Sequence, residues 1–287
     1  MDTRRTVSIL LTVIALLTPE VVPADASSGC TSSNSSSFTT IDAPGASFVS
    51  ATGINPQGDV VGRYVAANVT HAFLFSEGVL NSIDVPGASF TAGRSISPQG
   101  HIVGNYTLAG IGHGFLLHDG EFHSIDVPGA VATTAFGINA RGDIAGIVTS
   151  GGTDHGYLLR KGVFTTFDYP GASATQPFGM NARTDIVGAY TAAGVLHGFL
   201  LTDSGFTSVD VPGASATGSR GINSQREIVG EYTSGGVTHG FLLNDDVFTT
   251  IDVPGATQTN ALGINESGDI VGGYVAAGVR QGFLLCR

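Results

Sequence analysis

The chain has 287 residues, of which 42 are glycine and only 12% are charged, against a usual charged fraction of about 25%. Its 42% of hydrophobic residues is enough for a folded core, which argues against a disordered chain. A formal net charge of −11 at pH 7 argues against a nucleic-acid partner, because such a partner requires a basic face.

The N-terminus has the pattern of a secretory signal peptide, predicted over residues 1–26. Arg4 and Arg5 precede an apolar run over residues 7–17, and Ala24 and Ala26 are small residues at the positions that a signal peptidase reads. The run is too short for a membrane-spanning helix, which needs about 20 residues, and no later segment is long or apolar enough. We therefore expect an exported protein, extracellular or periplasmic, with a Ser-rich arm over residues 27–37 and no membrane span in the mature chain.

The rest of the chain, residues 38–287, is a repeat domain. The motif Asp-x-Pro-Gly-Ala recurs every 42 residues without insertion or deletion. It begins at Asp42, Asp84, Asp126, Asp168, Asp210 and Asp252. Self-similarity at this period indicates a solenoid, a propeller or an array.

The hydrophobic pattern predicts four strands in one repeat. In the fifth repeat they cover residues 221–223, 228–233, 239–243 and 247–253, and turn residues separate them. The last of these strands alternates, with Val247, Thr249 and Ile251 on one face and Phe248 and Thr250 on the other. No helical period appears in the domain. Four antiparallel strands in a repeat of this length match one blade of a β-propeller.

The two ends of the repeat domain favour a closed ring over an open stack. Solenoids normally end in polar capping repeats, whereas this sequence ends on an apolar third strand, residues 282–286. The missing fourth strand stands at the other end, as residues 38–43. We therefore expect an all-β, six-bladed β-propeller of four-stranded repeats, closed by the N-terminal strand completing the last blade. A β-solenoid with two coils per repeat is the main alternative.

The two cysteines favour the same closure. Cys30 precedes the first predicted strand and Cys286 is the penultimate residue, so closure brings them together in an oxidising compartment. We expect a Cys30–Cys286 disulfide. One alternative is lipidation of Cys30, although the preceding Ser27-Ser28-Gly29 lacks the aliphatic residue of a lipidation signal; the other is two unrelated thiols.

The repeat unit Gly-Ile-Asn-x-x-Gly-Asp-Ile-Val-Gly-x-Tyr, followed by His-Gly/Ala-Phe-Leu, resembles the HAF repeat of extracellular bacterial proteins. The characteristic string is His71-Ala72-Phe73, and the resemblance covers residues 38–287. The sequence departs from the pattern at Tyr157, which replaces Phe, and at Gln281, which replaces His. The resemblance implies an exported repeat fold and no particular chemistry.

Two polar positions recur with the repeat and are predicted to be structural. One is the Asp of Asp-x-Pro-Gly-Ala, and the other is a histidine at His71, His113, His155, His197 and His239. Equivalent residues on different blades lie too far apart to share a metal ion, so each side chain should satisfy polar groups within its own blade. The Asn-x-x-Gly-Asp segments supply too few oxygen ligands for calcium and are predicted to be hairpin turns. We expect no metal site and no cofactor.

Positions at which the repeats differ are better candidates for function. The segment after Pro-Gly-Ala is the most varied, and we expect it to form loops that rim one face of the central channel. Its last position is the predicted ligand-binding set, namely Thr52, Arg94, Phe136, Phe178, Arg220 and Leu262. Arginines and phenylalanines around a ring suit an anionic or apolar ligand. Drift on a tolerant loop is the alternative.

Two classes of function remain. The regular repeats, with no catalytic motif such as Gly-x-Ser-x-Gly, favour a monomeric non-catalytic scaffold without catalytic residues. Such a scaffold would bind an extracellular or envelope protein, a glycan or a small ligand through one propeller face. The alternative is an extracellular lyase or hydrolase with its site at the channel mouth. It requires a break in the repeat that carries acid and base groups, and the nearest departures are Arg63, Arg94 and Glu231.

Overall fold

The computed structural model describes Cys30 and residues 37–287 as an all-β protein. The predicted signal peptide and most of the Ser-rich arm lie outside the described residues, and Ser37, assigned to that arm, begins a strand instead. The described residues contain 24 strands and no helix, hence no helix that could cross a membrane. The predicted all-β class is confirmed.

Each repeat contributes strands that we number first to fourth by their order in the repeat. The first strands are β2 (Phe48–Ile54), β6 (Phe90–Ile96), β10 (Ala132–Ile138), β14 (Ala174–Met180), β18 (Ala216–Ile222) and β22 (Gln258–Ile264). The second strands are β3 (Val60–Ala66), β7 (Ile102–Leu108), β11 (Ile144–Ser150), β15 (Ile186–Ala192), β19 (Ile228–Ser234) and β23 (Ile270–Ala276). The third strands are β4 (Val69–Ser76), β8 (Ile111–His118), β12 (Thr153–Arg160), β16 (Val195–Thr202), β20 (Val237–Asn244) and β24 (Val279–Cys286). The fourth strands are β5 (Val79–Ser82), β9 (Glu121–Ile125), β13 (Val163–Phe167), β17 (Gly205–Val209), β21 (Val247–Ile251) and β1 (Ser37–Ile41).

Antiparallel pairing joins the strands of a repeat in chain order, as in β18-β19-β20-β21. In the last repeat the fourth position is filled by β1, which pairs with β24 from Ser37 opposite Cys286 to Ile41 opposite Gly282. This pairing of the N-terminal strand with the last one agrees with the sequence-based expectation. Two single parallel pairs, Phe48 with Arg280 and Thr70 with Phe90, link three repeats into a twelve-stranded sheet.

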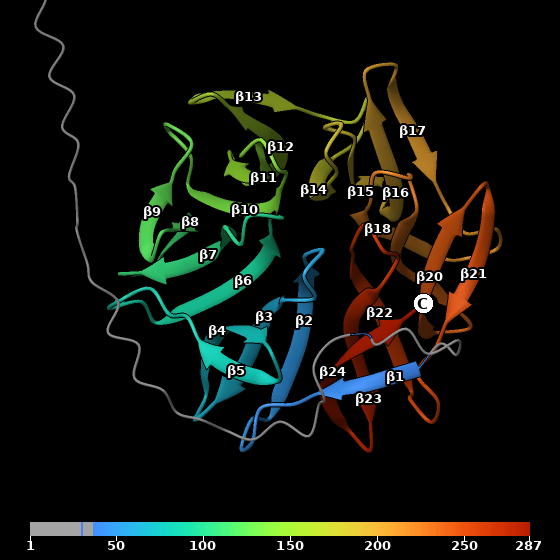
Figure 1. Ribbon diagram of the computed structural model, residues 1–287. Helices are drawn as coiled ribbons and strands as arrows, with labels where there is room; N and C mark the ends of the chain where they lie inside the picture. The colour runs from blue at the N-terminus through green and yellow to red at the C-terminus, as the bar shows by residue number, and fades with distance from the viewer. Residues whose placement is uncertain (1–29, 31–36) are drawn as a thin grey trace, which may run out of the picture.

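The first strands lie around a common centre. Each first strand contacts the first strand of the next repeat, and β22 contacts β2. Figure 1 shows the repeats arranged about this centre, with β1 beside β24 where the two ends of the described chain meet.

The first strands start earlier than the sequence pattern predicted. In the fifth repeat the strand was expected at Gly221–Asn223, but β18 begins at Ala216. The physical reason is a β-bulge between Ser219 and Gly221, which breaks the period-two alternation on which the expectation rested.

The repeated glycine of the second strand and the repeated aromatic residue of the third form one packing unit. The aromatic residue is fully buried in every repeat, as Phe73, Phe115, Tyr157, Phe199, Phe241 and Phe283. A Cβ atom added at Gly62 would lie 2.7 Å from the Phe73 ring, so only glycine permits this close approach. This packing explains the glycine that recurs in the second strand of every repeat.

The Asn-x-x-Gly-Asp segments are turns held by their own side chains. Asn55 Oδ1 accepts hydrogen bonds from the backbone N–H groups of Gln57 and Asp59, and Asn55 Nδ2 donates to Asp59 Oδ2 at 2.8 Å. The carboxylate is thus bound within the turn. Similarly, each repeat histidine bonds through Nδ1 to the Asp of its own repeat, as His71 does to Asp84 at 2.7 Å. The bonds between each histidine and its Asp lie within single repeats, whereas the turn asparagines also reach the next repeat, as Asn181 Nδ2 does at Asn223 O.

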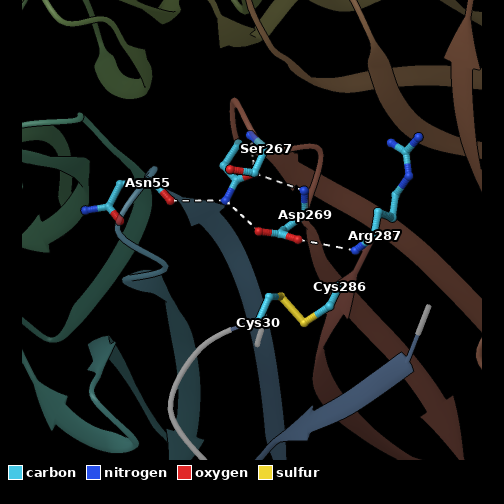
Figure 2. The surroundings of a disulfide bond; sticks show 7 residues. Cys30, Asn55, Ser267, Asp269, Cys286 and Arg287 are labelled. Carbon is cyan, nitrogen blue, oxygen red and sulfur yellow. Dashed lines mark hydrogen bonds between the residues drawn. A yellow bond between two sulfur atoms is a disulfide. The ribbon is translucent and has the colours of Figure 1, made fainter. Parts of the chain in front are cut away.

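A disulfide joins the two ends of the described chain, as the cysteine positions predicted. Cys30 and Cys286 are bonded with their Cα atoms 5.4 Å apart, so neither lipidation of Cys30 nor free thiols agrees with the structure. Figure 2 shows the bond beside Asp269, whose carboxylate accepts a hydrogen bond from the Arg287 N–H. Nearby, Asn265 Nδ2 donates to the backbone oxygen of Asn55 at 3.3 Å and connects the last repeat to the first.

Candidate functional site

The predicted ligand-binding residues occupy one unusual backbone position. In β18, Ser219 pairs with Gly230 and Gly221 with Val229, so Arg220 is the extra residue of a β-bulge. The same register shift occurs in all six first strands. The bulged residues are Thr52, Arg94, Phe136, Phe178, Arg220 and Leu262. These residues therefore lie within strands and not in rim loops as expected.

The bulges bring all six side chains to one central cavity of about 200 Å³. Bulges redirect a side chain out of the regular alternation and are common beside active sites. The cavity is completed by Ser50, Arg63, Glu231, Asn260 and Arg280. A second cavity, of about 100 Å³, lies toward the Asn turns and shares five of the six bulge residues, all but Phe136. The bulge residues shared by both linings thus lie between the two cavities.

Arg94 is partly buried against an aromatic wall. Its guanidinium carbon lies 4.9 Å from the centroid of the Phe136 ring, and its Nε donates to Asn105 Oδ1 at 3.0 Å. Burial, followed by the charges of Arg63 and Arg220, lowers the pKa of Arg94 to about 9, well below the ordinary arginine value. Among the described residues, the side-chain hydrogen-bond partner of Arg94 is the neutral Asn105 amide, and no carboxylate pairs with this guanidinium.

Arg220 and Glu231 form the ion pair of the cavity. Arg220 Nε donates to Glu231 Oε1 at 2.7 Å, and Arg220 Nη2 donates to the same oxygen. The Arg220 guanidinium also lies 3.9 Å from the centroid of the Phe178 ring, which fixes its plane. The other carboxylate oxygen, Glu231 Oε2, is buried without a hydrogen-bond partner.

Arg63 and Arg280 come from the first and last repeats and meet over one aromatic ring. Their guanidinium carbons lie 5.1 Å and 5.5 Å from the centroid of Phe48. Both Nε atoms are buried without a partner among the described residues. Burial lowers the pKa of both side chains, and the charge of Arg63 lowers that of Arg280 further.

Sequence reasoning undervalued three of these residues. Arg63 and Glu231 were noted only as departures from the repeat, and Arg280 was not considered. Arg63 and Glu231 occupy the same repeat position, at which the other repeats carry Asn105, Ile147, Ala189 and Gly273. The variability of this second-strand position was the missed signal. Arg280 precedes Gln281, the one departure from the repeat histidine.

The cavity has the opposite charge to the whole protein. The chain has a formal charge of −11, but four arginines and one glutamate line this cavity. Four of the side-chain atoms buried without partners in the described chain belong to its lining: Arg63 Nε, Glu231 Oε2, Asn260 Oδ1 and Arg280 Nε. Buried polar atoms normally have partners, so the lining has unused hydrogen-bonding capacity.

The described residues offer one cluster with metal-ligand spacing, Cys30, Asp269 and Cys286, and its two cysteines are the disulfide. The cavity lining contains a single carboxylate, Glu231. Its arrangement suits electrostatic stabilisation of negative charge beside one basic oxygen.

Solved structures of propeller-type proteins share this fold at low sequence identity. A streptogramin B lyase aligns over 88% of this chain and 98% of its own, with 16% identity and a TM-score of 0.51. A gluconolactonase from Xanthomonas campestris aligns over 94% and 98%, with 12% identity and a TM-score of 0.51. TolB from Acinetobacter baumannii aligns over 82% of this chain and 54% of its own, with 12% identity and a TM-score of 0.53. No family model and no curated protein matches the sequence, so the HAF resemblance stays a prediction.

These structures contradict the expectation of a non-catalytic scaffold. Proteins of this fold that are named for an activity include a lyase and a gluconolactonase. The expectation rested on the absence of familiar catalytic motifs from regular repeats. That reasoning fails because a propeller site is assembled from single residues on different repeats, which leave no continuous motif.

Proposed function

We propose that the protein is an exported six-bladed β-propeller lyase with its active site in the central cavity. Glu231 acts as the general base and removes a proton from a carbon acid. The surrounding arginines stabilise the negative charge that develops on the substrate. The single observation that carries this proposal is the carboxylate of Glu231, held at one oxygen by Arg220 and unpartnered at the other.

The arrangement of the strands supports the propeller, and two further observations support its export. The repeats supply four strands each, the first strands contact one another around the centre, and β22 contacts β2. The strand β1 completes the last group of four. Export is supported by the signal-peptide pattern and by the Cys30–Cys286 disulfide, because disulfides persist in oxidising compartments.

Glu231 fits the role of a base because its two oxygens differ. Arg220 donates both of its hydrogen bonds to Oε1, which orients the carboxylate. Oε2 keeps its lone pairs free of protein donors. A positioned base with a free lone pair contributes about 10²- to 10⁴-fold to the rate of proton transfer.

The arginines supply the complementary charge. Proton removal leaves an electron pair on the substrate carbon, and delocalisation onto an adjacent oxygen makes an anion. Arg63, Arg94 and Arg280 place fixed positive charge in the same cavity. The electron pair then forms a carbon–carbon double bond as the hydroxyl group departs from the neighbouring carbon. The proton held by Glu231 passes to that hydroxyl, which leaves as water and restores the base.

A lyase fits the cavity better than a hydrolase. Glycoside hydrolysis generally requires two carboxyl groups, one acidic and one basic or nucleophilic. The lining offers only Glu231. Elimination requires one base and a means of stabilising the carbanion, and both are present.

The test is Glu231→Gln, which keeps the shape of the side chain and removes its basicity. A panel of hydroxy acids is screened by the ultraviolet absorbance of the new double bond. We expect kcat to fall at least about 10²-fold with little change in KM. The matched control is Glu121→Gln, at an exposed site on β9. Equal kcat in the Glu231→Gln variant and the native protein would overturn the proposal.

A further inference from the structure

The cavity has an excess of positive charge that nothing in the described protein neutralises. Arg63, Arg94, Arg220 and Arg280 face one carboxylate, and that carboxylate is paired with Arg220. Three guanidinium groups are therefore left without an anionic partner among the residues that the structure describes. Partly buried like charges repel one another more strongly than exposed ones, because less water screens them. An anion in the cavity would relieve this repulsion.

Arg63, Arg94 and Arg280 also have N–H donors that make no hydrogen bond to the described residues. Arg63 and Arg280 donate no side-chain hydrogen bond to any described residue, and Arg94 donates only from Nε, to Asn105. Guanidinium groups present paired donors in a plane that matches the two oxygens of a carboxylate. Phe48 and Phe136 lie beneath these groups and hold them in place.

The size and walls of the cavity limit the ligand. Its volume of about 200 Å³ exceeds the roughly 150 Å³ cavity that holds benzene, so a ligand of modest size fits. Leu262 and Phe178 add apolar surface, while Ser50, Thr52 and Asn260 add hydrogen-bonding groups. Asn260 Oδ1 is buried without a partner and can accept from a hydroxyl or amino group.

We propose that the central cavity binds a small dicarboxylate, held by the guanidinium groups of Arg63, Arg94 and Arg280. Two negative charges are required because one carboxylate would leave most of the excess charge in place. The choice of carboxylate over other dianions rests on the proposed function, since a carboxylate next to the C–H bond acidifies the proton that Glu231 removes. The substrate class is therefore a small dicarboxylic acid with a leaving group next to the acidic carbon.

Binding of succinate to the full chain tests this proposal, by calorimetry and by thermal unfolding. Succinate has both carboxylates and no leaving group, so it binds without reacting. We expect succinate to raise the Tm, and we expect Arg94→Gln and Arg280→Gln each to weaken its Kd at least about tenfold. Arg183→Gln is the matched control, because its side chain is about half exposed and lies outside this cavity. Its Kd should equal that of the native protein.

Further ligands and variants separate the outcomes. Propionate, with one carboxylate, should bind at least about tenfold more weakly than succinate. Sulfate and phosphate are tested in the same way. If either binds more tightly than succinate, and loses affinity in the Arg94→Gln variant, the ligand class is an inorganic oxyanion and the dicarboxylate proposal is overturned. No succinate binding, or the same Kd in the native protein and both cavity variants, would overturn the site. If Arg94→Gln does not fold, Arg94→Lys keeps the charge but loses the paired donors, and it should still weaken succinate binding.

The Glu231→Gln variant separates this proposal from the proposed function. We expect it to bind succinate at least as tightly as the native protein, because it loses a negative charge from the cavity. Tight succinate binding with no turnover of any hydroxy dicarboxylate would overturn the proposed lyase activity and still support the proposed anion-binding site. Turnover of monocarboxylic substrates alone would overturn the dicarboxylate as the substrate class and still support the proposed lyase activity.

Discussion

The guanidinium of Arg280, on the last strand of the chain, lies 5.5 Å from the centroid of Phe48, on the first strand of the first repeat. Arg63 lies over the same ring at 5.1 Å. The candidate site is therefore built partly at the junction between the two ends of the repeat domain, where Phe48 and Arg280 also form a parallel strand pair. Interactions that stabilise this junction therefore also position Arg63 and Arg280.

The disulfide is the first test of this dependence. Cys286→Ser removes a bond that joins residues 256 positions apart, which the chain-entropy estimate values at up to about 5 kcal/mol. We expect denaturant unfolding at a clearly lower concentration, together with weaker succinate binding. Native protein treated with reductant should behave like the variant. Identical unfolding midpoints with and without reductant would show that the bond does not stabilise the junction.

Gly273 offers a way to move Arg280 without touching the rest of the lining. A Cβ atom at Gly273 would lie 2.8 Å from Arg280 Nη2 and 2.9 Å from its Nε. Gly273→Ala should therefore displace the guanidinium, since a flexible side chain yields before the backbone does. We expect the Kd for succinate to rise about tenfold with a change in Tm of only a few degrees. A large drop in Tm with unchanged Kd would contradict this account of Arg280.

Tyr157 is the one tyrosine among the buried aromatic residues of the third strands, and its hydroxyl has no hydrogen-bond partner. Burial raises the pKa of this side chain, so it remains neutral. Tyr157→Phe restores the residue of the other five repeats and should stabilise the protein by about 1 kcal/mol, because a buried unsatisfied hydroxyl is removed. Tyr106→Phe is the control. It removes a hydroxyl that bonds Ser124 at 3.1 Å and should destabilise the protein by a similar amount. Both free energies come from urea unfolding curves.

Asp185 links the turns of neighbouring repeats and makes stability depend on acid pH. Burial by itself would raise the pKa of Asp185, but hydrogen bonds from Arg226 and Asn181 and the charges of Arg226 and Arg183 outweigh it and lower the pKa. The folded protein thus favours the ionised form, and this stabilisation is present above the ordinary aspartate pKa and lost as pH falls through the folded value. Asp185→Asn should lower stability at pH 7 and have little effect at strongly acidic pH. An equal loss of stability at both pH values would contradict the ionic role.

Much of the scaffold was determined by the sequence alone. The unbroken 42-residue spacing from Asp42 onward predicted an all-β repeat, because each copy has to form the same strands with the same turns. The positions of Cys30 and Cys286 predicted their bond. The six variable positions line one cavity, although they lie within strands and not in the rim loops that the sequence predicted.

The tertiary structure decided the rest. The bulge at Arg220 could not be read from alternation, because an inserted residue shifts the pattern that defines a strand. The meeting of Arg63 with Arg280 depends on contacts between different repeats. The unequal environment of the two Glu231 oxygens depends on the ion pair with Arg220. A repeat sequence specifies what each copy has in common. The charge of the cavity arises from the positions at which the copies differ, and only their arrangement around the centre shows which of those residues meet.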